Sequence, residues 1–193
     1  MGCDIYSTSI NKNSADASLL NKIGLIHGFK IPEWSNKAKS GCLGLFCGGG
    51  LYSLEKLLKK HGLKTPHFNA DSWLPFEFKE PLSEDVIEKF SKINSDERNR
   101  DTEENSEFLY EITLLLDSKK IGSVSFLIED LKKIAKLLEI PQGVFTLNYK
   151  QLKQFVKKHD IFEEETFFHS SWLDLYSQAL YCQENNGILA LSV

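Results

Sequence analysis

Both ends of the chain carry short apolar runs that predict strands of one sheet. Residues 3–10 hold apolar and β-branched side chains before a polar cluster at 11–14, which is typical of a short strand. Residues 188–193 are apolar on both faces, and this pattern predicts a central strand covered on both sides. Because the termini of domains often lie close together, the first strand is the expected neighbour of the last.

The next apolar positions follow a helical period. From Ser14 onward they recur every three or four residues, which predicts a helix that Gly28 ends. The apolar run 42–47 predicts a buried strand, and the glycines at 48–50 predict the turn after it. Ser53 is then the expected N-cap of a helix that ends at Gly62.

The region from 63 to 81 contains three of the five prolines and predicts irregular structure, with a short strand at 76–78. The rest of the chain is predicted to be mostly helical. Apolar residues at helical spacing predict helices at 83–93, 108–116, 125–139 and 148–158, and a last helix that begins at Ser171. Residues 95–107 contain no large apolar side chain, and we expect them to form an exposed charged loop.

These elements predict an α+β fold, a helix-rich domain with a small sheet that includes the N- and C-terminal strands. The chain has 193 residues, of which 41% are apolar and 26% charged, as in ordinary globular proteins. Each half alone would have a thin core. We therefore expect residues 1–193 to form one domain with the exposed loop at 95–107.

The charge and cysteine content narrow the function classes. The formal net charge is −4, whereas proteins that neutralise phosphates need clustered Lys and Arg, so we expect no nucleic-acid partner. Four cysteines in a chain of this size are typical of a reducing compartment. With neither a secretory signal nor a membrane-spanning run, the sequence predicts a cytoplasmic protein that does not bind a membrane.

A family resemblance rests on the start of the chain and on its last third. Met1 and Gly2 lead into the first strand, and the remaining matches lie between residues 125 and 193. They are the run 129–135, Tyr176, Ala179, Gly187 and the final run 189–193. These features resemble the YfbM-like family of uncharacterised bacterial proteins. The resemblance implies an α+β fold and supplies no activity and no site residue.

Cys47 is the candidate nucleophile of a thiol-dependent hydrolase or acyl transferase. It follows a predicted strand and precedes glycines and a helix start, where backbone amides and the helix dipole favour a thiolate. His61 or His67 would act as the general base and Asp71 would orient it. The alternative is that Cys47 is a small core residue, since free cysteines are among the most buried side chains.

The same region fits a loose zinc-ligand spacing. Cys42, Cys47, His61 and His67 are spaced approximately as in Cys₂His₂ sites. However, Cys42 and Cys47 lie at opposite ends of one apolar run, and a domain with ample apolar residues needs no structural ion. We therefore predict no metal, and the glycines at 48–50 lack the spacing of a nucleotide fingerprint, so no cofactor is predicted.

Two functional hypotheses follow from these observations. The first is a non-enzymatic protein-binding or immunity-type module that masks a protein partner through an acidic, aromatic-bearing surface. The second is the thiol enzyme centred on Cys47. The binding module is favoured because, unlike the thiol enzyme, it does not require Cys47, a histidine and Asp71 to meet in one catalytic arrangement.

Overall fold

One mixed sheet organises the fold, and it contains both terminal strands. The computed structural model describes residues 3–36, 44–46, 48–83, 88, 118–159 and 167–192. Within these residues the strands are β1 (Cys3–Ser9), β2 (Gly44–Phe46), β3 (Ser72–Leu74), β4 (Ile121–Ser123) and β5 (Gly187–Ser192). Their order in the sheet is β2-β1-β5-β3-β4, antiparallel throughout except for β3 and β4, which are parallel. The predicted α+β class is confirmed.

The first and last strands pair along almost their full length. Their antiparallel register runs from Asp4 opposite Ser192 to Ser9 opposite Gly187. On its other side β5 pairs with β3, so β5 lies inside the sheet. This confirms the prediction that the C-terminal strand is central and has the first strand as its neighbour.

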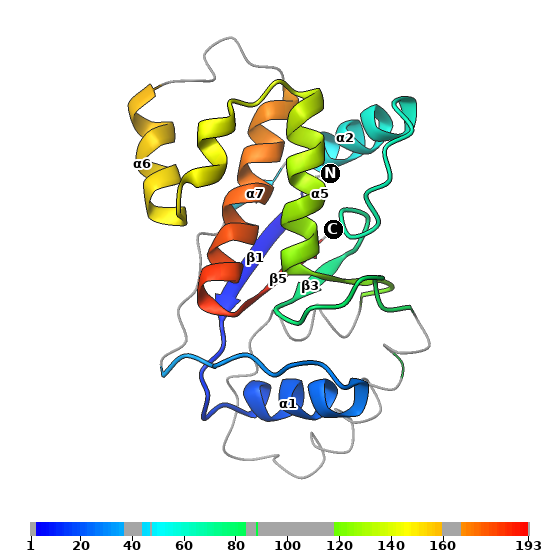
Figure 1. The fold of residues 1–193 in the computed structure, drawn as a ribbon, viewed down its shortest axis with the longest axis vertical. Helices are drawn as coiled ribbons and strands as arrows, with labels where there is room; N and C mark the ends of the chain where they lie inside the picture. The colour runs from blue at the N-terminus through cyan, green and yellow to red at the C-terminus, as the bar shows by residue number, and fades with distance from the viewer. Residues whose placement is uncertain are drawn as a thin grey trace.

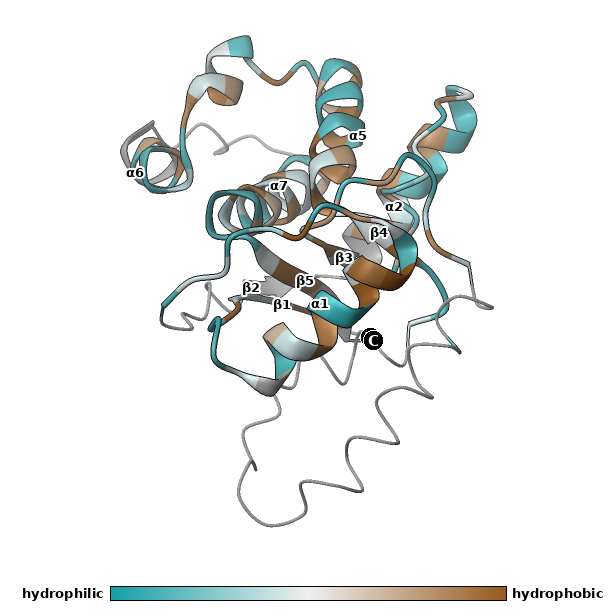
Figure 2. Cartoon of the chain, turned by 60° about the horizontal axis from the view of Figure 1, so that its bottom comes forward, coloured by the Kyte–Doolittle hydropathy of each residue, from teal (hydrophilic) through white to brown (hydrophobic). Residues whose placement is uncertain are grey.

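Helices cover both faces of the sheet (Figures 1 and 2). On one face lie α2 (Gly48–Lys60), α5 (Val124–Leu137) and α7 (Phe167–Asn185), and α1 (Ala15–His27) lies on the other. Successive residues of β5 face opposite layers: Leu189 packs into the core under α2, α5 and α7, and Ile188 packs into the core under α1. This alternation is the physical reason that the last strand is apolar at nearly every position.

Two smaller elements extend the layer that contains α7. The 3₁₀ helix η1 (Gln142–Thr146) and α6 (Tyr149–His159) follow α5, and α6 packs against α7. Tyr149 of α6 meets Tyr181 of α7 edge to face, with ring centroids 5.1 Å apart. The helix predicted at 148–158 is therefore confirmed to within one residue.

Several predicted helix ends are also confirmed. The Ser14 hydroxyl accepts a hydrogen bond from the Ala17 amide at the start of α1, and Gly28 ends that helix in the left-handed region at a φ of 68°. Gly62 follows α2 with a φ of 62°. Both glycines adopt a conformation that other residues reach only at a cost.

Three predicted boundaries were wrong. Residues 48–50 form the first turn of α2 instead of a separate turn, so Ser53 lies inside the helix; burial of Leu54 and Leu58 outweighs the low helix propensity of glycine. The strand expected at 76–78 lies instead at β3, and β4 was not predicted. The last helix begins at Phe167, four residues before Ser171.

The helices predicted at 83–93 and 108–116 lie almost entirely outside the described residues. The charged stretch at 95–107 also lies outside them, as do Cys42 and Cys47.

Candidate functional site

His67 lies in the connection between α2 and β3, and its buried ring is bonded on both sides. The ring Nδ1 accepts a hydrogen bond from the Ser123 amide at 3.0 Å, and Nε2 lies 2.8 Å from the carbonyl oxygen of Lys79. Because an amide can only donate and a carbonyl can only accept, the proton is on Nε2 and the ring is neutral. The ring also stacks on Phe126, with centroids 5.2 Å apart.

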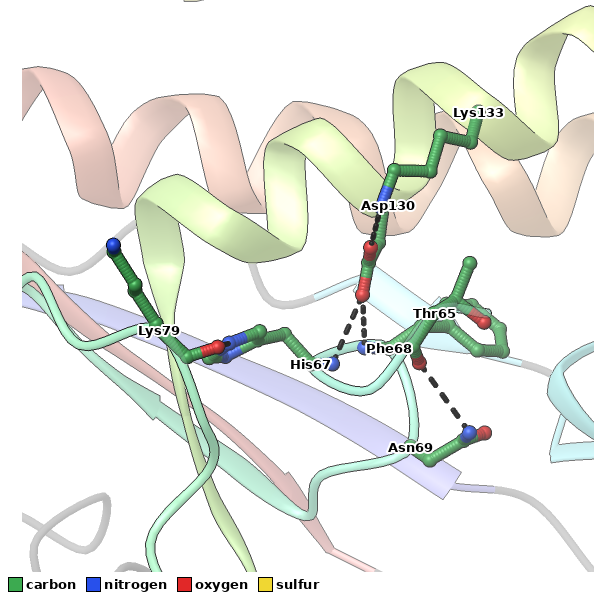
Figure 3. Close-up of polar contacts among 7 residues, drawn as sticks. All are labelled: Thr65, His67, Phe68, Asn69, Lys79, Asp130 and Lys133. Carbon is green, nitrogen blue, oxygen red and sulfur yellow. Dashed lines mark hydrogen bonds and ion pairs between the residues drawn. The ribbon is translucent and has the colours of Figure 1, made fainter. Parts of the chain in front are cut away.

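The main chain at His67 is held by a buried carboxylate from α5 (Figure 3). Asp130 Oδ2 accepts hydrogen bonds from the amides of His67 at 2.9 Å and Phe68 at 3.2 Å. Asp130 Oδ1 pairs with Lys133 Nζ at 2.7 Å, one turn along the same helix. The Asp130 side chain is 3% exposed and the Lys133 side chain 46% exposed. The negative charge of the buried Asp130 carboxylate is therefore compensated by two main-chain amides and by a partly solvated lysine.

Two further bonds fix the shape of this connection. The indole Nε1 of Trp73 donates to the His67 carbonyl oxygen at 2.6 Å. The side-chain amide Nδ2 of Asn69 donates to the main-chain carbonyl oxygen of Thr65 at 3.3 Å (Figure 3). We call His67, Asp130, Lys133, Ser123 and Trp73 the His67 cluster. Through these residues and the Lys79 carbonyl oxygen, the 65–79 region is joined to Ser123 and α5, which come much later in the sequence.

Asp71 does not orient His67. Its carboxylate accepts hydrogen bonds from the amides of Lys119 at 3.0 Å and Lys120 at 3.1 Å. Its main chain bonds Lys120 and Leu191, so Asp71 ties the residues before β4 to the sheet. The carboxylate therefore organises a turn, and the expected pairing of Asp71 with His67 is not formed.

Of the remaining candidates, His61 is the one that the described residues include. His61 is exposed just after α2, whereas the ring of His67 is buried. Cys47 lies outside the described residues. Across the parts of the chain that the structure describes, no three His, Cys, Asp or Glu side chains gather as a metal ion would require.

The sequence reasoning missed Asp130, which is the centre of the buried polar network. Asp130 lies between Ile128 and Leu131 on the inward stripe of α5, and the sequence analysis assigned it no site role. A carboxylate on the buried face of an amphipathic helix, with a lysine three residues later, was the available signal.

Comparison of the chain with protein-family models, with curated proteins and with solved structures found no match. The resemblance to the YfbM-like family therefore stays a prediction. Within the described ranges, no helix is both long and apolar enough to cross a membrane.

Proposed function

We propose that this chain is a non-enzymatic protein-binding module, of the immunity type, which masks a basic protein partner through its acidic segment. The acidic segment is residues 84–117. It contains eleven of the 27 acidic residues and four of the 23 basic ones, a net charge of −7. Because the whole chain carries −4, the remainder carries +3. This segregation of charge is the observation that carries the proposal.

The structure supports the proposal by the way the acidic segment is attached. Leu82, two residues before it, exchanges both backbone hydrogen bonds with Ile121, four residues after it, at 2.8 and 3.3 Å. Ile121 belongs to β4, which is an edge strand. The residues that flank the segment thus meet at one point on the edge of the sheet. A concentrated negative field at such a point attracts a basic surface and accelerates its association.

The buried polar groups favour binding over thiol catalysis. Both ring nitrogens of His67 bond to main-chain groups, and Asp71 bonds to the amides of Lys119 and Lys120. In this arrangement neither His67 nor Asp71 can serve as base or orienting group for Cys47, because a general base needs a free lone pair within reach of the proton. The thiol hypothesis then depends on Cys47 and His61 alone.

Affinity capture with three baits tests the proposal. The wild-type chain is compared with a loop variant, in which Asp96, Glu97, Asp101, Glu103 and Glu104 become Asn or Gln. A body variant carries the same loss of five charges at exposed positions elsewhere, namely Glu33, Glu77, Glu80, Glu129 and Glu139.

A basic protein recovered in stoichiometric amount by the wild type and the body variant, and lost by the loop variant, is the expected result. Equal capture by all three baits would contradict the proposal, because another surface would then bind the partner. Equal loss of capture in both variants would also contradict it, because net charge alone would then explain binding.

A further inference from the structure

The outer face of α1 carries an exposed apolar pair. Leu25 is 73% exposed and Ile26 59%, and only Tyr52 is a comparably exposed large hydrophobic residue among those that the structure describes. Farther toward the start of the helix, the outward positions Ser18 and Lys22 are polar. The apolar surface is therefore confined to the C-terminal end of α1, which is coloured as hydrophobic in Figure 2. Two adjacent side chains of this size cost free energy when left in water.

Aromatic contacts join the residue just after α1 to the stretch of chain that precedes the acidic segment. Phe29, just after α1, stacks on Phe78 with ring centroids 5.1 Å apart and also contacts Phe76 at 5.7 Å. Four residues after Phe78, Leu82 packs against the same core on the α1 side of the sheet. Leu82, two residues before the acidic segment, thus lies on the side of the sheet that α1 covers.

The two faces of the sheet are covered unequally. Three helices, α2, α5 and α7, share the core of one face, whereas the described residues place only α1 on the other. Residues 84–117, apart from Glu88, lie outside the described residues. The side chains of Leu82 before them and Ile121 after them both pack into the core on the α1 side. Thirty-four residues are enough for two short helices and a connection.

The sequence of this segment contains apolar positions that need a surface to cover. They recur at helical spacing on both sides of the charged stretch at 95–107. These positions are Val86, Ile87, Phe90 and Ile93 before it, and Leu109, Ile112, Leu115 and Leu116 after it. An amphipathic helix is stabilised mainly by burying its apolar face. The exposed pair on α1 is an apolar surface on the side of the sheet where Leu82 and Ile121, which flank the segment, pack into the core.

We infer that the outer face of α1, through Leu25 and Ile26, is the docking surface for residues 84–117 of the same chain. In this arrangement the two apolar stretches pack against α1 and the charged stretch between them faces solvent. The inference is independent of the proposed function: the segment docks on α1 whether or not its charged stretch binds a partner.

Photo-cross-linking from position 25 tests the inference directly. The full-length protein carries p-benzoylphenylalanine in place of Leu25, and a matched control carries it in place of Tyr52, which is exposed to a similar degree on α2. After irradiation of dilute protein, peptide mass spectrometry identifies the attached segment. The expected product is a monomer in which position 25 is joined to a peptide from 84–117, while position 52 is not.

Three results of the cross-linking would overturn the inference. Covalent dimers would show that a second copy covers the patch. No adduct from position 25 would show that the patch faces solvent. An adduct between position 52 and the same peptides would show random contact.

A second measurement uses ordinary variants. Leu25→Asp is expected to raise the rate of trypsin cleavage after Lys89 and Lys92, which lie within the first apolar stretch, by about tenfold or more. Cleavage there follows the population of the undocked form. Tyr52→Asp is expected to leave that rate unchanged. An unchanged rate in Leu25→Asp would contradict docking, since an aspartate at a solvated helix position has no reason to affect a distant segment.

Discussion

Asp130 accepts a 2.9 Å hydrogen bond from the main-chain amide of His67, a residue 63 positions earlier in the chain. This bond, with those to Phe68 and Lys133, lets a buried carboxylate join α5 to the connection before β3. Because the acceptor is charged and nearly inaccessible, its removal leaves two amides in a region from which water is excluded.

Replacing Asp130 by alanine is therefore expected to lower the free energy of unfolding by about 3 kcal/mol, since it breaks a buried, paired charge. Urea titration monitored by circular dichroism measures the change. Lys133→Ala is the matched control and is expected to cost less than about 1 kcal/mol, because the lysine is partly solvated. Equal losses in the two variants would show that the ion pair, and not the amide bonds, supplies the stability.

His67 and His61 are expected to differ sharply when replaced. His67→Ala leaves the Ser123 amide and the Lys79 carbonyl oxygen without their partner and creates a cavity beside Phe126, at a cost of about 3 kcal/mol. His61→Ala, at an exposed position, is expected to change stability by less than about 0.5 kcal/mol. The two unfolding midpoints in urea measure the difference, and similar midpoints would refute a structural role for the His67 ring.

Asp174 on α7 supplies a prediction of pH dependence. Burial raises the pKa of Asp174 above its usual range. A carboxyl whose pKa is higher in the folded than in the unfolded state destabilises the fold at neutral pH, and this cost disappears as the pH falls below the unfolded value. Asp174→Asn is therefore expected to melt at a higher temperature than the wild type near neutral pH, with the difference closing toward about pH 4.

Thermal unfolding across that pH range checks this, with Glu129→Gln at an exposed position as the control. A difference in melting temperature that stays constant with pH would show that the effect does not come from ionisation of Asp174.

The thiol of Cys47 provides a test of the alternative function. If Cys47 is not an activated nucleophile, its alkylation by iodoacetamide is expected to slow about tenfold for each pH unit below about 8.5, as for an ordinary thiol. Peptide mass spectrometry separates Cys47 from the other three cysteines. Fast alkylation of Cys47 alone that persists at low pH, and that His61→Ala abolishes, would restore the thiol enzyme as the leading hypothesis.

The sequence predicted two kinds of feature correctly. These are helix ends marked by a local residue type, and a strand that is apolar on both faces because helices cover both sides of the sheet. The apolar terminal strand identified β5 as central, and Gly28 and Gly62 marked the ends of α1 and α2. β3 and β4 were missed because three residues are too few to show alternation. The glycines at 48–50 were misplaced because local propensity favours a turn and tertiary packing favours a helix.

The candidate site was less predictable, for a physical reason. Asp71 was predicted to orient His61 or His67 as the general base. Their partners are distant instead: His67 bonds Ser123 and Lys79, and Asp71 bonds the turn at 119–120. Such contacts depend on how the sheet brings separate segments together, and no spacing rule contains that information.

The salt dependence of partner binding is the decisive test of whether residues 84–117 bind a basic protein. The captured partner is titrated calorimetrically into the wild type, the loop variant and the body variant, at low and at physiological ionic strength. If the acidic segment binds the partner, the wild type and the body variant lose affinity as the salt concentration rises. The loop variant then binds at least about tenfold more weakly, and its affinity depends less on salt. Equal affinity and equal salt dependence in all three proteins would contradict binding through the acidic segment.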